Sequence, residues 1–292
     1  RQVSSAASDV YKRQDIQYII DNALNEDLGL DRVDITTDAL IEKTDIVNAL
    51  ISSRSGCIVA GLDIAKQVFQ TIDERLEFKS FCSDGDSIES EKKLLQIRGS
   101  ASSILKAERT ALNLFQRMCG IATLTSNFLK ASNRLDLLIL DTRKTTPGLR
   151  IIEKLAVSIG GGTNHRMGLY DAVMIKDNHI SIWSSKENKT LSDAVKTAKK
   201  LYPEYKIQVE VDTIDQLKEV IHAKPDWVLL DNMSIDQLRN AVTHCSGICK
   251  TEASGGITLK TIKDIADTGV DAVSIGALTH SVHSVDLGLD FI

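Results

Sequence analysis

The second half of the chain alternates short apolar runs with longer segments whose apolar residues recur every three or four positions. The short runs predict six strands, at 135–140, 171–176, 206–211, 226–230, 248–253 and 271–275. The intervening segments predict five helices, at 148–160, 191–202, 213–223, 234–245 and 258–269. Strands that alternate with helices of this length are typical of βα units and a parallel sheet. Since a complete barrel of this type has eight strands, six predict an incomplete TIM-like α/β barrel.

The first half has a less regular pattern. Ile16, Ile19, Ile20, Ala23 and Leu24 recur at helical spacing and predict an amphipathic helix. Strands are expected within 48–61, 76–81 and 92–99, and a helix at 63–72. A long helix is predicted over 100–118, with an interruption at Gly120 and a further helix over 122–132. These elements predict a separate N-terminal α/β domain.

Composition narrows the class of protein. The chain has 292 residues, a formal net charge of −5 and a pI of about 5.7, which argues against a general nucleic-acid or membrane-surface protein. Aromatic residues make up 4%, too few for a base-stacking platform. Five scattered cysteines fit reduced thiols in a cytoplasmic protein. Cys245 and Cys249 have metal-like spacing, but no second Cys/His pair completes a zinc site.

The first fourteen residues, RQVSSAASDVYKRQ, differ in character from the rest. They are rich in Ser and Ala, include no initiator Met and lack the apolar core of a signal peptide. We therefore expect residues 1–14 to be a non-native segment and the fold to begin at Asp15.

Polar residues and glycines lie at or just past the end of every predicted barrel strand, where α/β barrels carry their chemistry. These positions are Arg143, Lys144, Lys176, Glu210, Asp231, Ser254, Gly255, Gly256, Ser274 and Gly276. From Asp141 to His179 the chain carries six Lys and Arg residues but four acids, although the whole chain is acidic. The acids Glu210 and Asp231 follow later strands, so one side of the rim is expected to be cationic and the other acidic.

The residue types indicate which ligands this rim would take. Arginine presents a planar fork that suits carboxylate and phosphate. The glycines in SGGI (254–257) and SIGA (274–277) let backbone N–H groups approach a phosphate. Paired carboxylates suit ribose hydroxyls or Mg²⁺. Together these features predict a sugar phosphate on one side of the site and a small anionic acid on the other.

Seven segments give the chain a resemblance to a known family, the quinolinate phosphoribosyltransferases. They are ERTALNLFQRMCGIAT (108–123), LDTRKTTPGLR (140–150), GGGTNHRMGLYDAVMIKDNHI (160–180), VEVDT (209–213), LLDNM (229–233), EASGGI (252–257) and SIGALTHS (274–281). The resemblance implies an N-terminal α/β sandwich-like domain at 15–119 and an incomplete barrel at 120–280. It also implies that the tail, 281–292, packs back on the first domain, and that a homodimer or larger homo-oligomer shares its active sites between subunits.

The same resemblance implies an activity. Phosphoribosyl is transferred from phosphoribosyl pyrophosphate to quinolinate with decarboxylation, which yields nicotinate mononucleotide, pyrophosphate and CO₂ for NAD biosynthesis. Mg²⁺ is the implied cofactor, near Glu210 and Asp231. Arg143, His165 and Arg166 would bind quinolinate, with Lys144 and Lys176 close by and Arg109 reaching in from the neighbouring subunit. Ser254, Gly255, Gly256, Ser274 and Gly276 would hold the 5′-phosphate, while Lys144, Lys176, Glu210 and Asp231 are the expected catalytic residues.

Other interpretations stay open at the level of sequence. Arg143 and Lys144 could lie in a solvated loop, His165 could be structural, and Arg109 could pair with Glu108 on its own helix. A relative of the same fold could act on another acid, such as nicotinate, although a monocarboxylate needs fewer cations. A non-catalytic phospho-ligand sensor would tolerate the loss of Glu210, Asp231 or Lys144, which are all present.

Overall fold

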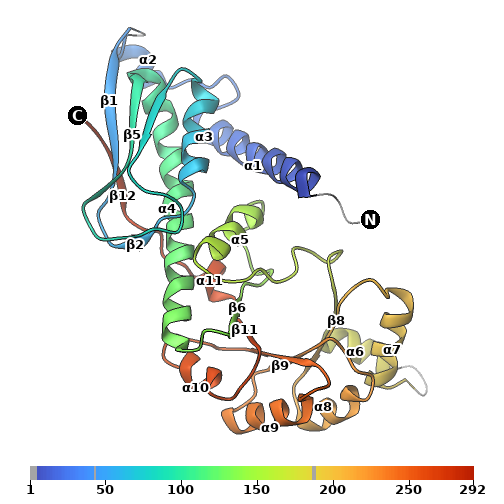
Figure 1. Ribbon diagram of the computed structural model, residues 1–292. Helices are drawn as coiled ribbons and strands as arrows, with labels where there is room; N and C mark the ends of the chain where they lie inside the picture. Colours follow the sequence, from blue (N-terminus) through green and yellow to red (C-terminus); the bar gives the residue numbers. More distant parts are fainter. Residues whose placement is uncertain (1–4, 43, 186–188) are drawn as a thin grey trace. The chain divides into compact units, whose positions relative to one another are not determined.

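The computed structural model describes residues 5–42, 44–185 and 189–292 (Figure 1). It divides into two compact units: Arg1–Ser126 with Thr145–Gly161 and Thr279–Ile292, and Asn127–Lys144 with Gly162–Leu278. The first four residues of the segment expected to be non-native lie outside the described residues. Within the part of the chain that is described, no helix combines the length and the apolar character needed to span a membrane.

The first unit contains an antiparallel sheet in the order β12-β1-β5-β3. Its strands are β1 (Ile46–Ser53), β3 (Glu77–Ser80), β5 (Lys92–Ser100) and β12 (Leu287–Phe291). β12 pairs with β1 from Ala49 opposite Phe291 to Ser53 opposite Leu287, so the end of the chain closes one edge of this sheet. A second, two-stranded sheet joins β2 (Cys57–Ile58) to β4 (Ser87–Ile88).

Helices accompany this sheet. They are α1 (Ser5–Leu28), α2 (Ile35–Leu40), α3 (Leu62–Ile72), α4 (Ala101–Ser132) and α5 (Arg150–Ile159), and α11 (Ala277–His280) follows the last barrel strand. α2 lies in a stretch for which the sequence pattern predicted no helix. Asp34 caps it, because its carboxylate accepts hydrogen bonds from the N–H groups of Thr36 and Thr37. α5 follows the first barrel strand in sequence but is part of the first compact unit.

The interruption predicted at Gly120 is wrong, because α4 runs without a break from Ala101 to Ser132. The reason for glycine at this position is a close backbone contact. A Cβ atom on Gly120 would lie 2.2 Å from the carbonyl oxygen of His283, in the segment that leads to β12. The helix therefore tolerates the roughly 1 kcal/mol helix-propensity cost of glycine so that the returning tail can pack against it.

The second unit is built on a parallel sheet of six strands in the order β6-β11-β10-β9-β8-β7. The strands are β6 (Leu138–Leu140), β7 (Val173–Ile175), β8 (Ile207–Val211), β9 (Trp227–Asp231), β10 (Lys250–Ser254) and β11 (Ala272–Ser274). The first strand pairs with the last, as in a barrel, but β6 and β7 do not pair with each other among the described residues. The predicted fold class, an incomplete α/β barrel with an N-terminal α/β domain, is confirmed.

The barrel helices begin at local sequence signals. They are α6 (Asp177–Ser184), α7 (Leu191–Leu201), α8 (Ile214–Ile221), α9 (Ile235–Cys245) and α10 (Ile262–Ala266). Thr190, Thr213 and Ser234 each accept a hydrogen bond from the N–H three residues on, in a capping box. α6 was not predicted from the sequence; its first turn is closed by His179, whose Nδ1 accepts the backbone N–H of Lys176 at 3.0 Å.

Candidate active site

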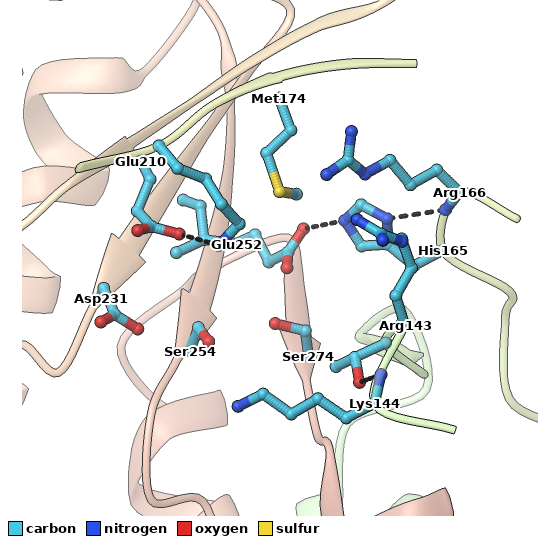
Figure 2. A pocket seen from close by; sticks show the side chains of 13 residues that line it. Arg143, Lys144, His165, Arg166, Met174, Glu210, Asp231, Glu252, Ser254 and Ser274 are labelled. Atoms are coloured by element: carbon cyan, nitrogen blue, oxygen red, sulfur yellow. Dashed lines mark hydrogen bonds and ion pairs between the residues drawn. The ribbon is translucent and has the colours of Figure 1, made fainter. Parts of the chain in front are cut away.

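A cavity of about 380 Å³ lies at the carboxyl ends of the barrel strands (Figure 2). Its lining residues are Thr142, Arg143, Lys144, His165, Arg166, Met174, Lys176, Glu210, Leu229, Asp231, Glu252, Ser254 and Ser274. The strand register arranges them in layers, with Glu210, Leu229 and Glu252 side by side and Asp231, Ser254 and Ser274 one step further along. The two layers are two residues apart because side chains alternate between the faces of a strand.

Asp141 organises the cationic side of the cavity. It is fully buried directly after β6. One carboxylate oxygen accepts the backbone N–H of His165 at 2.8 Å, and the other accepts Nδ2 of Asn164 at 2.7 Å. The Thr163 backbone also bridges to Leu140. The loop that carries His165 and Arg166 is thereby fixed beside β6.

Two guanidinium groups face the same cavity. Burial lowers the pKa of Arg166 below its usual value, and the neighbouring charge of Arg143 lowers it further. Nη1 of Arg166 donates to the carbonyl oxygen of Ala172 at 3.0 Å, which fixes the side chain against the segment before β7. Two like charges held together in a half-buried cavity favour an anion between them.

The acidic side is formed by the ends of β8 and β9. Oε2 of Glu210 lies 2.5 Å from Nζ of Lys176, and Glu210 is 9% exposed. Asp231 accepts a hydrogen bond from Nδ2 of Asn232 at 2.7 Å and keeps access to the cavity. Lys176 and Asp231 thus flank Glu210 across three neighbouring strands, β7, β8 and β9.

Glu252 lies on the floor of the cavity and is 1% exposed. Its Oε2 atom accepts Nε2 of Gln208 at 2.7 Å, from β8 on the other side of β9, and lies 3.4 Å from Nε2 of His165. The backbone N–H of Arg166 donates to Nδ1 of His165 at 2.7 Å. His165 is therefore held by protein groups at both ring nitrogens.

The glycine loop after β10 has a backbone that only glycine adopts easily. Gly255 has φ of +98°, and a Cβ atom there would lie 2.1 Å from Oδ1 of Asn232. Gly256 has φ of +61° and has no such neighbour. Asn232 itself has φ of +52° and donates its backbone N–H to the carbonyl oxygen of Ser254. The two turns after β9 and β10 therefore interlock beside Asp231 and Ser254.

The structure brings most of the predicted residues together. Nine line the cavity: Arg143, Lys144, His165, Arg166, Lys176, Glu210, Asp231, Ser254 and Ser274. Gly255, Gly256 and Gly276 occupy the adjoining loops. Arg109 lies on α4 in the other compact unit, with an exposed side chain, and its role at a partner's site stays a prediction.

Sequence reasoning missed three lining residues, Thr142, Met174 and Leu229, and assigned no role to a fourth, Glu252. A signal for three of them was available. Met174, Leu229 and Glu252 each precede a predicted site residue by two positions on a strand, and period-two alternation places such pairs on one face. Thr142 stands between Asp141 and Arg143 in the first loop.

The comparisons with known proteins agree with this site. The family model described as "Quinolinate phosphoribosyl transferase, C-terminal domain" matches residues 121–290, and its N-terminal counterpart matches residues 34–119. The chain belongs to the quinolinate phosphoribosyltransferase family. The family's two domain models thus cover both the sheet of the first unit and the incomplete barrel.

Members of the family are similar over nearly the whole chain. A probable nicotinate-nucleotide pyrophosphorylase [carboxylating] of Bacillus subtilis is 38% identical, across 94% of this chain and 93% of its own. A solved nicotinate-nucleotide pyrophosphorylase from Francisella tularensis has 37% identity and a TM-score of 0.88, with 96% of each chain covered. One from Ehrlichia chaffeensis has 36% identity and a TM-score of 0.88, with both chains covered fully. Human nicotinic acid phosphoribosyltransferase, at 11% identity and a TM-score of 0.64, shares the fold alone.

Proposed function

We propose that this protein transfers phosphoribosyl from phosphoribosyl pyrophosphate to the ring nitrogen of quinolinate, with loss of CO₂ and pyrophosphate, and so makes nicotinate mononucleotide for NAD biosynthesis. The names of the family members, quinolinate phosphoribosyltransferase [decarboxylating] and nicotinate-nucleotide pyrophosphorylase [carboxylating], support this activity. The observation that carries it is the division of one cavity into a cationic side and an acidic side.

The cationic side suits the aromatic dianion. Quinolinate has two adjacent carboxylates. Arg143 and Arg166 line one cavity, and each has a planar guanidinium group that can bind a carboxylate through two N–H donors. Holding the ring nitrogen against the sugar carbon converts a bimolecular encounter into an intramolecular one, which can contribute several kcal/mol. Lys144 adds a further positive charge at the same wall.

The acidic side suits the sugar. Positive charge develops on the ribose ring as pyrophosphate leaves, and the carboxylates of Glu210 and Asp231 can stabilise that charge in a cavity shielded from water. Lys176 holds Glu210 in place at 2.5 Å. Ser254, Ser274 and the backbone N–H groups around Gly255, Gly256 and Gly276 suit the 5′-phosphate. Once the ring nitrogen carries the sugar, its positive charge stabilises the electron pair that stays on C2 as CO₂ leaves. A proton from water then takes the place of CO₂ on C2, so no organic cofactor is required.

Mg²⁺ is part of the proposal. Among the described residues, no group of three or more His, Cys, Asp or Glu side chains forms a metal cage. Mg²⁺ commonly uses one or two carboxylates together with substrate phosphates and water, and Glu210 and Asp231 fit that donor set. When bound, the ion neutralises charge on the pyrophosphate.

A homodimer with shared active sites is also proposed. The unpaired β7 side of the barrel is surrounded by large apolar side chains that are exposed by 43–74%: Leu169, Tyr170, Ile182, Leu201, Tyr202 and Tyr205. An apolar surface of this kind is typical of a protein interface. Arg109, exposed on α4, is the cation proposed to enter the neighbour's cavity.

The cytoplasmic location remains a proposal, supported by five free cysteines, while several plant relatives are named as chloroplastic or mitochondrial.

The test is a coupled assay on the purified protein with phosphoribosyl pyrophosphate and Mg²⁺. Either quinolinate or nicotinate is supplied, and nicotinate mononucleotide and CO₂ are followed. Product and CO₂ from quinolinate are expected, with loss of activity in Arg143→Ala. Arg239→Ala, which removes the same charge from the exposed face of α9, is the matched control. Product from nicotinate alone would overturn the assignment of the acid, and no product from either would favour a phospho-ligand sensor.

A further inference from the structure

A buried carboxylate in the cavity has no role in the proposed function so far. Glu252 is 1% exposed, and its Oε1 atom is a buried side-chain oxygen without a hydrogen-bond partner among the described residues. Burying a carboxylate is costly, and a buried polar group left partly unsatisfied in a native fold calls for an explanation. The protein contacts of this carboxylate converge on its other oxygen, Oε2.

Those contacts form a chain that ends at a substrate-binding arginine. Gln208 donates to Oε2 of Glu252, and Nε2 of His165 lies 3.4 Å from the same oxygen. On the other side of the ring, Nδ1 of His165 accepts the backbone N–H of Arg166 at 2.7 Å. A nitrogen that accepts a hydrogen bond carries no proton, so the ring proton belongs on Nε2, facing Glu252.

We propose that Glu252 is a positioning residue: it fixes the His165 imidazole in the Nε2–H tautomer and, through that ring, the backbone of Arg166 at the quinolinate side of the cavity. The proposal deepens the proposed function and rests on it. It also changes the role of His165. With Nε2 directed at Glu252 and Nδ1 at the backbone of Arg166, the ring supports that arginine.

Because Oε1 of Glu252 has no hydrogen-bond partner among the described residues, the proposal predicts different effects for two substitutions of Glu252. In Glu252→Gln, the side-chain carbonyl can occupy the Oε2 position and keep both donors, and the amide nitrogen takes the Oε1 position, where no protein donor opposes it. In Glu252→Leu, Nε2 of His165 and the amide of Gln208 both lose their acceptor. Glutamine should therefore rescue the function that leucine removes.

The kinetic test is a double-mutant cycle between Glu252→Leu and His165→Phe, with Glu252→Gln alongside. Glu252→Leu is expected to raise KM for quinolinate about tenfold, as for loss of a hydrogen bond to a charged group. KM for phosphoribosyl pyrophosphate should stay within about twofold. Glu252→Gln should stay within about threefold of the parent protein. In the His165→Phe background, Glu252→Leu should add little, because its effect passes through the ring.

A spectroscopic measurement separates failure of this proposal from failure of the proposed function. The Nε2 proton of His165 should exchange slowly and give a downfield ¹H signal that is assigned by its absence in His165→Phe. The signal should persist in Glu252→Gln and disappear in Glu252→Leu, whichever substrate the protein uses, and thermal unfolding checks that each variant is folded. Additive effects of Glu252→Leu and His165→Phe, equal damage from glutamine and leucine, or a signal that survives in Glu252→Leu would each overturn the proposal.

Discussion

Nζ of Lys176 lies 2.5 Å from Oε2 of Glu210, joining the carboxyl ends of β7 and β8 inside the cavity. The carboxylate is almost buried, whereas the Lys176 side chain is 42% exposed. The pair therefore fixes the position of the Glu210 carboxylate on the acidic side of the site while part of the lysine remains open to solvent.

Glu210→Gln is expected to lower kcat about 100-fold, because it removes a preorganised charge opposite the developing positive ribose. Lys176→Met should lower kcat less, about tenfold, because Glu210 keeps its charge but loses its fixed position. Steady-state kinetics with both substrates measures these effects. Lys196→Met is the control, since that lysine is 64% exposed on α7 and lies 3.9 Å from Asp193. A larger loss from Lys176→Met than from Glu210→Gln would contradict the order proposed.

Gly255→Ala is expected to raise KM for phosphoribosyl pyrophosphate by at least about tenfold. Its φ of +98° is unfavourable for alanine, and the added Cβ would lie 2.1 Å from Oδ1 of Asn232. The loop proposed to hold the 5′-phosphate must then move. Gly247→Ala is a matched control, because φ is +71° and no atom lies within 4 Å of the added Cβ. The control should lose about 1 kcal/mol of stability with unchanged KM; an equal rise in KM for both variants would argue against the proposed phosphate site.

Mixing two inactive variants tests the shared active site. In the proposed homodimer, Arg109→Ala removes the incoming arginine from both sites, and Arg143→Ala removes the resident arginine from both. A mixed dimer would contain one site with both arginines, so random exchange should restore about a quarter of the parent activity. Activity after unfolding and refolding the mixture is compared with each variant treated alone. No recovery, in a mixture shown to contain mixed dimers, would place both arginines in the same subunit's site.

A buried ion pair in the first unit gives a prediction for stability. Nη2 of Arg117 lies 2.6 Å from Oε1 of Glu153, which is fully buried, and Oε2 of Glu153 accepts the backbone N–H of Thr146 at 3.1 Å. Arg117→Leu leaves that carboxylate without its countercharge and should lower the free energy of unfolding by about 3–5 kcal/mol.

Urea denaturation of Arg117→Leu and of the control Arg98→Leu measures the difference. Arg98 pairs with Glu77 on an exposed part of the sheet, at 58% and 70% exposure, so its loss should change stability by less than about 1 kcal/mol. Similar effects for the two variants would mean that the buried pair contributes no more than an exposed one.

Much of the site could be predicted from the residues at the strand ends, because the chemistry of those side chains can be recognised in the sequence alone. Arg143, Lys176, Glu210 and Asp231 each follow an apolar run, and the barrel brings such positions to one rim. Glu252 was not assigned because the sequence does not say which apolar-strand positions face the cavity. The helix over Gly120 was misread because a glycine that serves a tertiary contact looks the same in sequence as one that ends a helix.

The sequence by itself determined the alternation of strands and helices in the barrel apart from α6, the cationic and acidic halves of the rim, and the family. These depend on hydrophobic periodicity and on residue types at short range. Only the tertiary structure decided that β12 closes the first sheet, that α5 belongs to the first unit, and that Glu252 meets His165. Each of these joins segments distant along the chain, and such contacts are fixed by packing and hydrogen-bond geometry in three dimensions rather than by any local pattern.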